Sequence, residues 1–181
     1  SQLVDSASGI HARHNAQYIR TIRMDKKDPI TDFLIEAGVK HEDCQMNPRS
    51  TSIFSFPIRA PKGAITRNDK SAIEQLELWL TYQRHWCEHK PSVTISVKDK
   101  EWVEVGSWVW KHFDEISGVS FLPHSDHTYP QAPYQDASVD QVTELEKVTP
   151  TVLDWSLFIE QDDNTTGAQE LACSSGSCEI I

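Results

Sequence analysis

Two cysteines near the end of the chain could carry redox chemistry. Cys173 and Cys178 enclose a stretch of serine and glycine. A thiolate exchanges with an external disulfide, and a thiol with an ordinary pKa of about 8.5 needs little activation for that reaction. A serine- and glycine-rich segment resists packing and behaves as a flexible coil, which gives such thiols reach. This pattern predicts a dithiol that collects reducing equivalents at one place and delivers them at another.

Two other interpretations of this pair stay open at this point. The segment could be a frayed end with incidental cysteines, because chain termini are often poorly ordered. It could also be half of a zinc site, although structural zinc sites use four converging ligands and shorter cysteine spacings. The remaining cysteines, Cys44 and Cys87, are isolated in the sequence and offer no second half.

Two groups of histidines raise the question of a metal site. His85, Cys87 and His89 lie close together, and His124 and His127 lie in a later loop. On a helix Cys87 would point away from the two histidines beside it, so the three could not converge on one ion. We therefore expect packing roles for this group and predict no metal site. No nucleophile triad, phosphate-binding P-loop or paired-carboxylate motif accompanies it.

The elements that must position these residues follow from periodicity and from turn signals. Alternating segments predict strands over residues 18–22, 51–58, 93–97 and 118–122, the last of them stopped by Pro123. Helical spacing predicts helices over residues 29–37, from Asn68 and Asp69 as caps to His89, from Asp99 as a cap to Phe113, and from the capping box at Ser138 to Val148. Helices that alternate with strands indicate an α/β fold.

The predicted helices carry apolar stripes that should face a core. The long helix has Ile73, Leu76, Trp79, Leu80 and Trp86 at helical spacing, and the next has Trp102, Val105, Val109 and Phe113. A long loop is expected over residues 124–137. A last apolar anchor is expected at Trp155, Leu157, Phe158 and Ile159, followed by disorder after Asp162.

Composition narrows the class of protein. The formal net charge of −10 argues against non-specific nucleic-acid binding, which depends on dense lysine and arginine. No run of apolar residues is long enough to span a membrane, and the first residues do not read as a secretory signal. We expect a cytoplasmic protein without membrane contacts. The lack of an initiating methionine suggests a piece of something longer.

Sequence motifs spread along almost the whole chain carry a family resemblance. They include Ser6-Ala7-Ser8-Gly9-Ile10-His11, Ser117-Gly118-Val119-Ser120-Phe121-Leu122-Pro123 and Gln131-Ala132-Pro133-Tyr134-Gln135, with residues 54–57, 75–79, 85–97, 125–129 and 163–167. With these motifs in family order, the chain resembles the adenosylcobalamin-dependent, class II ribonucleotide reductases. The tail that holds Cys173 and Cys178 is similar to the family's C-terminal electron shuttle.

The resemblance implies a division of the chain and a function. Residues 1–137 would be the last strands and helices of a ten-stranded α/β barrel, residues 138–162 a helical extension and residues 163–181 a flexible redox tail. The complete enzyme would reduce ribonucleotides by a thiyl-radical mechanism started by adenosylcobalamin. Cys173 and Cys178 would re-reduce the active site and take electrons from a thioredoxin-type reductant.

The same resemblance says what this chain lacks. The radical cysteine and most of the substrate-phosphate loop would lie in the remaining N-terminal part of the reductase, so we expect no activity from this chain alone. Ser1 matches the last residue of that loop, and the turn at residues 6–9 could offer backbone amides to a phosphate. Ser1 also suits the residue that follows an intein. The alternative is a non-enzymatic interaction module or an inactive remnant.

Overall fold

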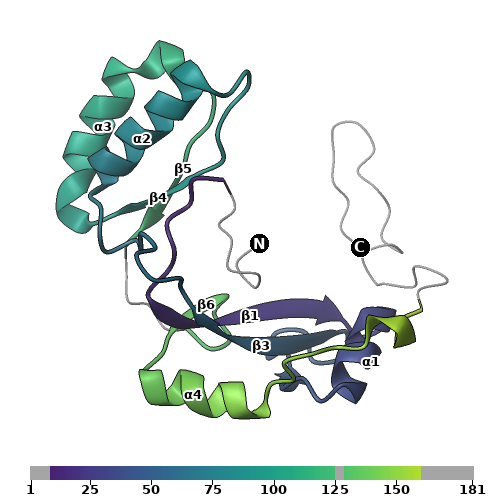
Figure 1. Cartoon of the computed structure of the whole chain (residues 1–181). Helices are drawn as coiled ribbons and strands as arrows, with labels where there is room; N and C mark the ends of the chain where they lie inside the picture. Colours follow the sequence, from purple (N-terminus) through teal and green to yellow (C-terminus); the bar gives the residue numbers. More distant parts are fainter. Residues whose placement is uncertain (1–8, 125–128, 160–181) are drawn as a thin grey trace. The chain divides into compact units, whose positions relative to one another are not determined.

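The computed structural model describes residues 9–124 and 129–159, and the chain divides into two compact units (Figure 1). The first unit is formed by residues up to Tyr18 together with Ile58–Thr128. The second is formed by Ile19–Pro57 together with the residues from Tyr129 onward. The predicted disorder after Asp162 and the two cysteines of the tail lie outside the described residues.

A two-stranded parallel sheet and two helices form the first unit. Strand β4 (Thr94–Val97) pairs with β5 (Ser120–Pro123), with Ile95 opposite Phe121. Helices α2 (Ala72–His85) and α3 (Trp102–Lys111) pack on this pair of strands. The fully buried residues of the shared core include Leu76, Trp79, Ile95 and Val97. Parallel strands need a crossover connection, and here it is the helix α3. Short 3₁₀ turns at Asp99–Glu101 and Phe113–Glu115 flank that helix.

Helix α2 begins later and ends earlier than the sequence predicted. A capping box at Ser71 begins it, since the Ser71 hydroxyl accepts a hydrogen bond from the Glu74 amide and the Glu74 carboxylate accepts one from the Ser71 amide. Asp69 is not the cap, because its carboxylate accepts hydrogen bonds from the amide and hydroxyl of Thr66 in the preceding turn. The helix ends at His85, so Trp86 leaves the apolar stripe and is 82% exposed.

Helix α3 also differs in its start and in its buried face. Asp99 caps nothing; instead the buried Glu101 carboxylate accepts hydrogen bonds from the backbone amides of Lys98 and Ala72. Val105 and Trp108 face the core, whereas the predicted stripe members Trp102 and Phe113 are exposed. Val105 and Val109 of the predicted stripe are confirmed, since Val109 packs against the same core. Phe113 lies beyond the last helical turn, in the 3₁₀ segment, and so leaves the stripe. The sequence predicted that Pro123 stops this strand, but Pro123 is the last residue of β5 and pairs with Val97.

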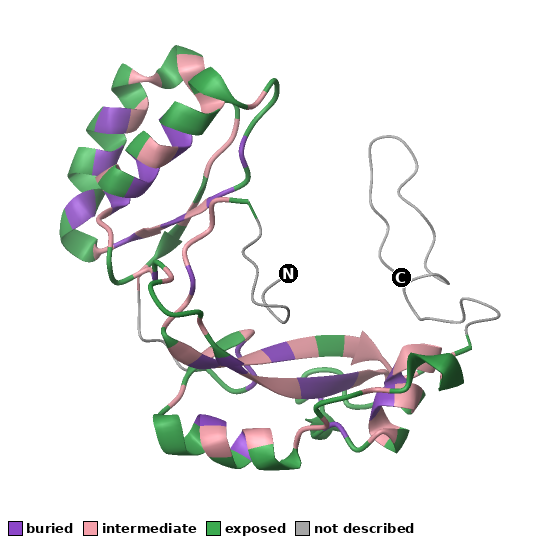
Figure 2. Cartoon of the chain, in the orientation of Figure 1, coloured by how far each residue is buried: buried purple, intermediate pink, exposed green. Residues whose placement is uncertain are grey.

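A four-stranded sheet with two helices forms the second unit. Its strand order is β2-β3-β1-β6, where β1 is Gln17–Asp25, β2 is His41–Asp43, β3 is Thr51–Arg59 and β6 is Tyr134–Asp136. Helix α1 (Pro29–Glu36) has Asp28 as its N-cap, and α4 (Val139–Val148) has the predicted capping box at Ser138. Figure 2 shows the buried residues of this unit along β1 and β3 and on α4. The strands over 18–22 and 51–58 and both helices are therefore confirmed.

The two short strands were missed. All three residues of His41–Asp43 are exposed, and Tyr134–Asp136 lies in the segment predicted as a loop. Gln131 precedes β6 with a φ of 58° and is nevertheless buried. Its side-chain amide donates to the backbone oxygen of Asp43, and its side-chain oxygen accepts from the amide of Gln45. These polar contacts hold the segment, so no apolar alternation signals it.

The last apolar anchor is only partly buried. Phe33 on α1 contacts Trp155 and Phe158, with ring centroids 5.1 and 5.6 Å apart. Leu157 and Ile159, however, are 72% and 69% exposed. The α/β class is confirmed by these two units, and each described sheet is open. Among residues 9–124 and 129–159, no helix combines the length and the apolar character that a membrane crossing requires.

Candidate functional site

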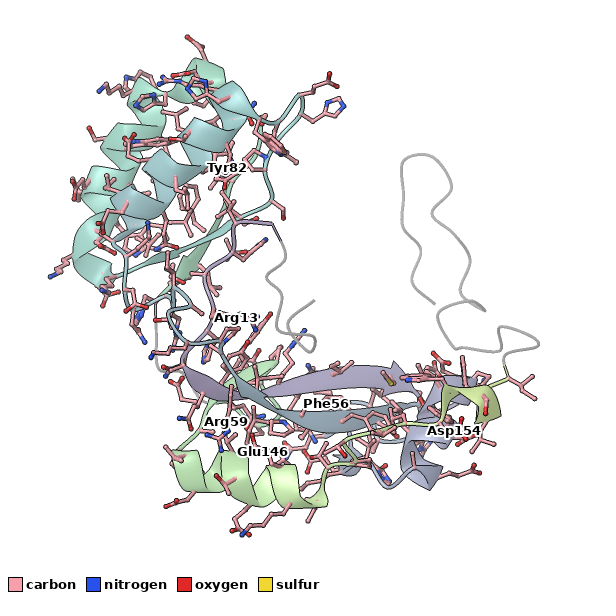
Figure 3. All side chains as sticks on the ribbon, viewed as in Figure 1. Arg13, Phe56, Arg59, Tyr82, Glu146 and Asp154 are labelled. Atoms are coloured by element: carbon pink, nitrogen blue, oxygen red, sulfur yellow. The ribbon has the colours of Figure 1, made fainter. Side chains whose placement is uncertain are left out.

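A hollow of about 430 Å³ lies within the first unit, next to the turn that the sequence singled out. Three segments line it: residues 9–13, the loop residues 61 and 63–65, and Lys70 with the α2 residues Gln75, Leu78 and Tyr82. Figure 3 labels Arg13 and Tyr82 on two of these segments. A ligand site of small-molecule size has this order of volume.

Backbone hydrogen bonds fix the first two walls against each other. Arg13 forms a parallel bridge with Thr66, in which the Arg13 amide donates to the Ile65 oxygen at 2.9 Å and the Arg67 amide donates to the Arg13 oxygen at 2.8 Å. The Arg67 guanidinium also donates to the His14 oxygen. The wall at residues 9–13 begins in a turn at Gly9 and Ile10 and is held at Arg13 by main-chain contacts to the loop wall.

Gly9 is required at the entrance to this wall. Its φ is +58°, and a Cβ added there would lie 2.9 Å from the backbone oxygen of Ser92. Side chains at positive φ are strained, and a Cβ does not approach a backbone oxygen so closely. The Ser92 side chain also contacts this wall, because its hydroxyl lies 3.1 Å from His11 Nε2, within hydrogen-bond distance.

The chemistry of the hollow is mostly apolar with few polar groups. Ile10, Ile65, Leu78 and Tyr82 supply apolar surface, and Lys70 is a cationic residue in the lining. Burial lowers the pKa of His11 below its ordinary value of 6.5, so this imidazole is neutral at pH 7. Such a lining can accept a flat apolar body whose anionic group pairs with lysine or with backbone amides.

A second polar group lies at the carboxyl ends of the two parallel strands. The His124 amide donates to the Val97 oxygen at 2.7 Å, and His124 Nε2 lies 2.9 Å from the Asn68 side-chain oxygen. In open α/β sheets ligands bind beyond the carboxyl ends of the strands. His124 and Asn68 therefore mark the edge at which a ligand of β4 and β5 would be expected.

The candidate site residues of the sequence analysis lie partly outside the described residues. Ser1, Cys173, Cys178 and His127 lie outside the described residues. His85 and His89 are exposed, and within the described ranges no group of three histidine, cysteine or acidic side chains could hold a metal ion.

The two internal cysteines are free thiols. Hydrogen bonding from the backbone at Asn47 lowers the pKa of the Cys44 thiol. That thiol is nevertheless buried, which closes it to external disulfides. The structure thus gives neither Cys44 nor Cys87 a chemical role.

Sequence reasoning found one wall of the hollow and missed the others. The small-residue turn ending at Gly9 signalled a possible anion cradle. Lys70 and Tyr82 gave no such signal, because one lies in a polar loop and the other on an exposed part of α2. The residues 61–65 are aperiodic, and contacts of the flanking residues bring them to the site, chiefly the bridge between Arg13 and Thr66.

Comparisons with known proteins show which proteins this chain is similar to. No protein-family model matches the chain. An adenosylcobalamin-dependent ribonucleoside-triphosphate reductase of Euglena gracilis is 30% identical over 146 residues, which are 80% of this chain and 20% of that protein. A probable enzyme of the same name from Dictyostelium discoideum is 28% identical over 185 residues, covering 100% of this chain and 24% of that protein. This chain is homologous to part of the adenosylcobalamin-dependent ribonucleotide reductases.

A solved structure supports the same fold. The crystal structure of a B-12 dependent (class II) ribonucleotide reductase matches with a TM-score of 0.61 and 23% identity, over 78% of this chain and 20% of that one. The chain thus spans about a fifth to a quarter of the length of these reductases. The resemblance to class II reductases that the sequence motifs carried is confirmed.

Proposed function

We propose that this chain is part of a ribonucleotide reductase that depends on adenosylcobalamin and converts ribonucleotides to deoxyribonucleotides. The observation that carries the proposal is the similarity to enzymes of that name over 80% or more of the chain. Because the chain spans a minor part of those enzymes, its role is to complete a site that other segments share. We expect no turnover from this chain by itself.

The walls described above are suited to the nucleotide side of the reaction. Gly9 lies at the start of the wall formed by residues 9–13, and the residues before it, back to Ser1, would complete the phosphate loop. Lys70 in the adjacent hollow offers a positive charge to an anionic group. The proposal therefore assigns Ser1 to the substrate phosphate and the strand ends at His124 to the same face of the enzyme. It leaves open whether the substrate is a diphosphate or a triphosphate.

The cofactor finds no complete site in the described residues. The relatives are adenosylcobalamin-dependent enzymes, but the hollow beside Gly9 measures about 430 Å³ and suits a ligand of nucleotide size rather than a corrin. No cluster of metal-ligating side chains occurs in these ranges. We therefore assign no residue of this chain to cobalamin and place no reaction step on it.

The proposed barrel accounts for the open edges of the first sheet. Two parallel strands with helices on one face leave edges and a face that parallel sheets normally cover. We propose β4 and β5 as two of ten barrel strands, with their neighbours supplied by the remainder of the reductase. Leu122 on β5 is exposed here, which agrees with a position that faces other strands or the barrel interior.

The proposed redox role of the tail is a disulfide exchange. Reduction of the ribose 2′ carbon releases water and takes two electrons and two protons from a pair of active-site thiols, which become a disulfide. A Cys173 or Cys178 thiolate attacks one sulfur of that disulfide and expels the other as a thiolate. The second tail thiol then attacks the mixed disulfide, which restores the active-site dithiol and leaves a Cys173–Cys178 disulfide. A dithiol reductant of the thioredoxin type returns the tail to its reduced form.

The test compares two reductants on the full-length enzyme. Cys173→Ser and Cys178→Ser should each abolish turnover driven by thioredoxin and thioredoxin reductase, and should keep turnover driven by dithiothreitol, which reaches the active site directly. Cys87→Ser, which removes a half-buried free thiol, is the matched control and should keep both activities. Equal loss of both activities in the tail variants would refute the relay.

The alternative is an interaction module or an inactive remnant with a redox-inert tail. Thiol titration of the isolated chain separates it from the relay. A relay gives a single reversible disulfide between Cys173 and Cys178 that thioredoxin reduces. An inert tail gives thiols that stay reduced or that pair at random.

A further inference from the structure

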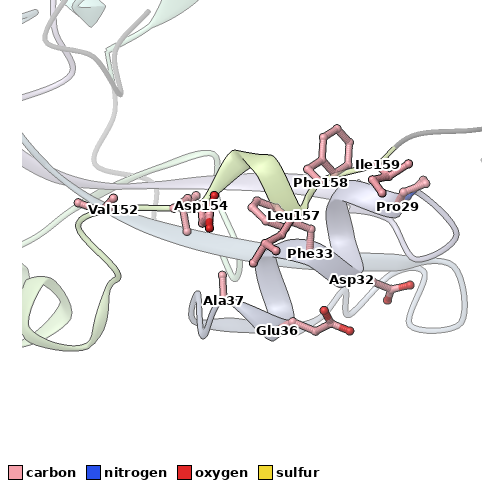
Figure 4. A pocket seen from close by; sticks show the side chains of 11 residues that line it. Pro29, Asp32, Phe33, Glu36, Ala37, Val152, Asp154, Leu157, Phe158 and Ile159 are labelled. Carbon is pink, nitrogen blue, oxygen red and sulfur yellow. The ribbon is translucent and has the colours of Figure 1, made fainter.

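The second unit carries a groove that the proposed reductase chemistry does not use. It has a volume of about 600 Å³ and lies between helix α1 and the segment Val152–Ile159, as Figure 4 shows. Phe33, Leu157 and Phe158 form its apolar part. The rings of Phe33 and Phe158 contact each other in a tilted arrangement with centroids 5.6 Å apart, and Leu157 is largely exposed. Phe33 and Phe158 are partly buried, whereas Leu157 and Ile159 are exposed. A groove with exposed aliphatic side chains over partly buried aromatic rings can receive an apolar segment of another protein.

The rim of this groove is acidic. Asp32 and Glu36 lie one turn apart on α1, and Asp154 lies on the opposite segment; the lining holds no lysine, arginine or histidine. Within the described residues neither Asp32 nor Glu36 has an ion-pair partner. Hydrogen bonds from the hydroxyl and amide of Ser156 lower the pKa of Asp154 and keep it charged. Three carboxylates thus lie in the lining beside the apolar part, and the described residues that line the groove include no lysine or arginine.

Charge decides which occupant suits this groove. The residues that follow it, 160–181, contain five acidic residues and no lysine or arginine, so the chain's own end is repelled by the rim. A second copy of the chain also carries a formal net charge of −10. We propose that the groove binds a basic amphipathic segment of a partner protein, whose apolar side chains contact Phe33 and Leu157 and whose lysines or arginines pair with the rim.

Binding of a defined peptide to the full 181-residue chain tests this proposal. The probe is a fluorescein-labelled Lys/Leu peptide with its leucines at helical spacing, and the comparison peptide has glutamate in place of lysine. Fluorescence anisotropy should detect the basic peptide only. Binding should weaken between 0.1 and 1 M salt, because the Debye length falls from about 10 Å to about 3 Å.

Two variants assign the binding to the groove. Asp32→Asn with Glu36→Gln should weaken binding about three- to ten-fold, which is the range expected for two exposed ion pairs. Asp99→Asn with Glu104→Gln removes the same net charge from exposed positions of the first unit and should leave binding unchanged. Leu157→Ser should weaken it as well, with the far-ultraviolet circular dichroism of the chain preserved.

Three results would overturn the proposal. Equal weakening by the two double variants would mean attraction to the net charge of the chain. Equal binding of the acidic peptide would mean a purely apolar contact. Self-association of the wild-type chain that disappears in the Leu157→Ser variant would assign the groove to a second copy.

Discussion

Replacing Gly9 by alanine tests whether this residue holds the wall of the hollow against Ser92. Two costs add. The φ of +58° belongs to the left-handed region, which costs an L-residue about 1–2 kcal/mol. The new Cβ would lie 2.9 Å from the Ser92 backbone oxygen, and relieving such overpacking costs about 1–3 kcal/mol. We therefore expect a loss of about 2–5 kcal/mol in the free energy of unfolding of the first unit.

A matched glycine separates the two costs. Gly63 also has a positive φ, of 82°, but a Cβ there meets nothing within 4 Å. Gly63→Ala should lose only the backbone cost of about 1–2 kcal/mol. Gly106→Ala, in open space on helix α3, should gain about 0.5–1 kcal/mol. Urea unfolding of the 181-residue chain measures all three.

A local readout ties the effect to the hollow. If the methyl group of Gly9→Ala pushes Ser92 away, the bond between Ser92 Oγ and His11 Nε2 breaks and the imidazole becomes more exposed. The pKa of His11, lowered by burial, should then rise toward its ordinary value in a proton NMR titration. A loss for Gly9→Ala no larger than that for Gly63→Ala, with an unchanged His11 pKa, would refute the reasoning.

Two further predictions concern the packing of the first unit. Arg84 donates two hydrogen bonds to Glu115, and together with His112 it lowers the pKa of Glu115 from 4.5 to about 2. The stability from this ion pair is present above pH 4.5 and is lost as the pH falls toward 2. The urea midpoint of the Glu115→Gln variant should therefore fall less between pH 5 and about 2.5 than that of the wild type. A fall as steep as in the wild type would contradict this prediction. Trp79→Ala should lower the free energy of unfolding by about 3–5 kcal/mol because that side chain is fully buried. Trp86→Ala should change it by less than about 0.5 kcal/mol because that side chain is exposed. Similar losses for the two variants in a urea titration would contradict the register of α2.

The sequence predicted elements best where caps and apolar periodicity agreed. Ser138 begins α4 as its capping box indicates, and Leu76 and Trp79 are buried at their helical spacing. The start of α2 was misplaced because Asn68 and Asp69 have cap-forming side chains that the structure uses in other bonds, one to His124 and one to Thr66. Local composition cannot tell which of several capping residues the tertiary structure occupies.

The missing elements have a common physical cause. Strands β2 and β6 are three residues long and largely exposed, so they carry no apolar alternation, and pairing partners distant in the sequence define them. The hollow shows the same limit, since the contact that assembles it joins Arg13 to Thr66 through backbone atoms. Side-chain patterns predict buried faces, but they do not predict main-chain bridges between aperiodic segments. The tail cysteines stay a sequence prediction, outside the described residues.

The hydrogen bonds from β1 to the segment before β6 have a consequence for the order of folding. Arg20 donates to the backbone oxygen of Pro133 and Arg23 to that of Gln131, across separations of 113 and 108 positions. During synthesis the first half of the second unit must therefore wait, with one flank of β1 unpaired, until the whole of the residues 58–128 has left the ribosome. Closing so long a loop is slow, whereas α2, β4, α3 and β5 follow one another in the chain and meet through nearer contacts. A nascent chain that stops before residue 129 lacks β6 and the segment before it, so the edge of β1 that they cover would be open to other strands.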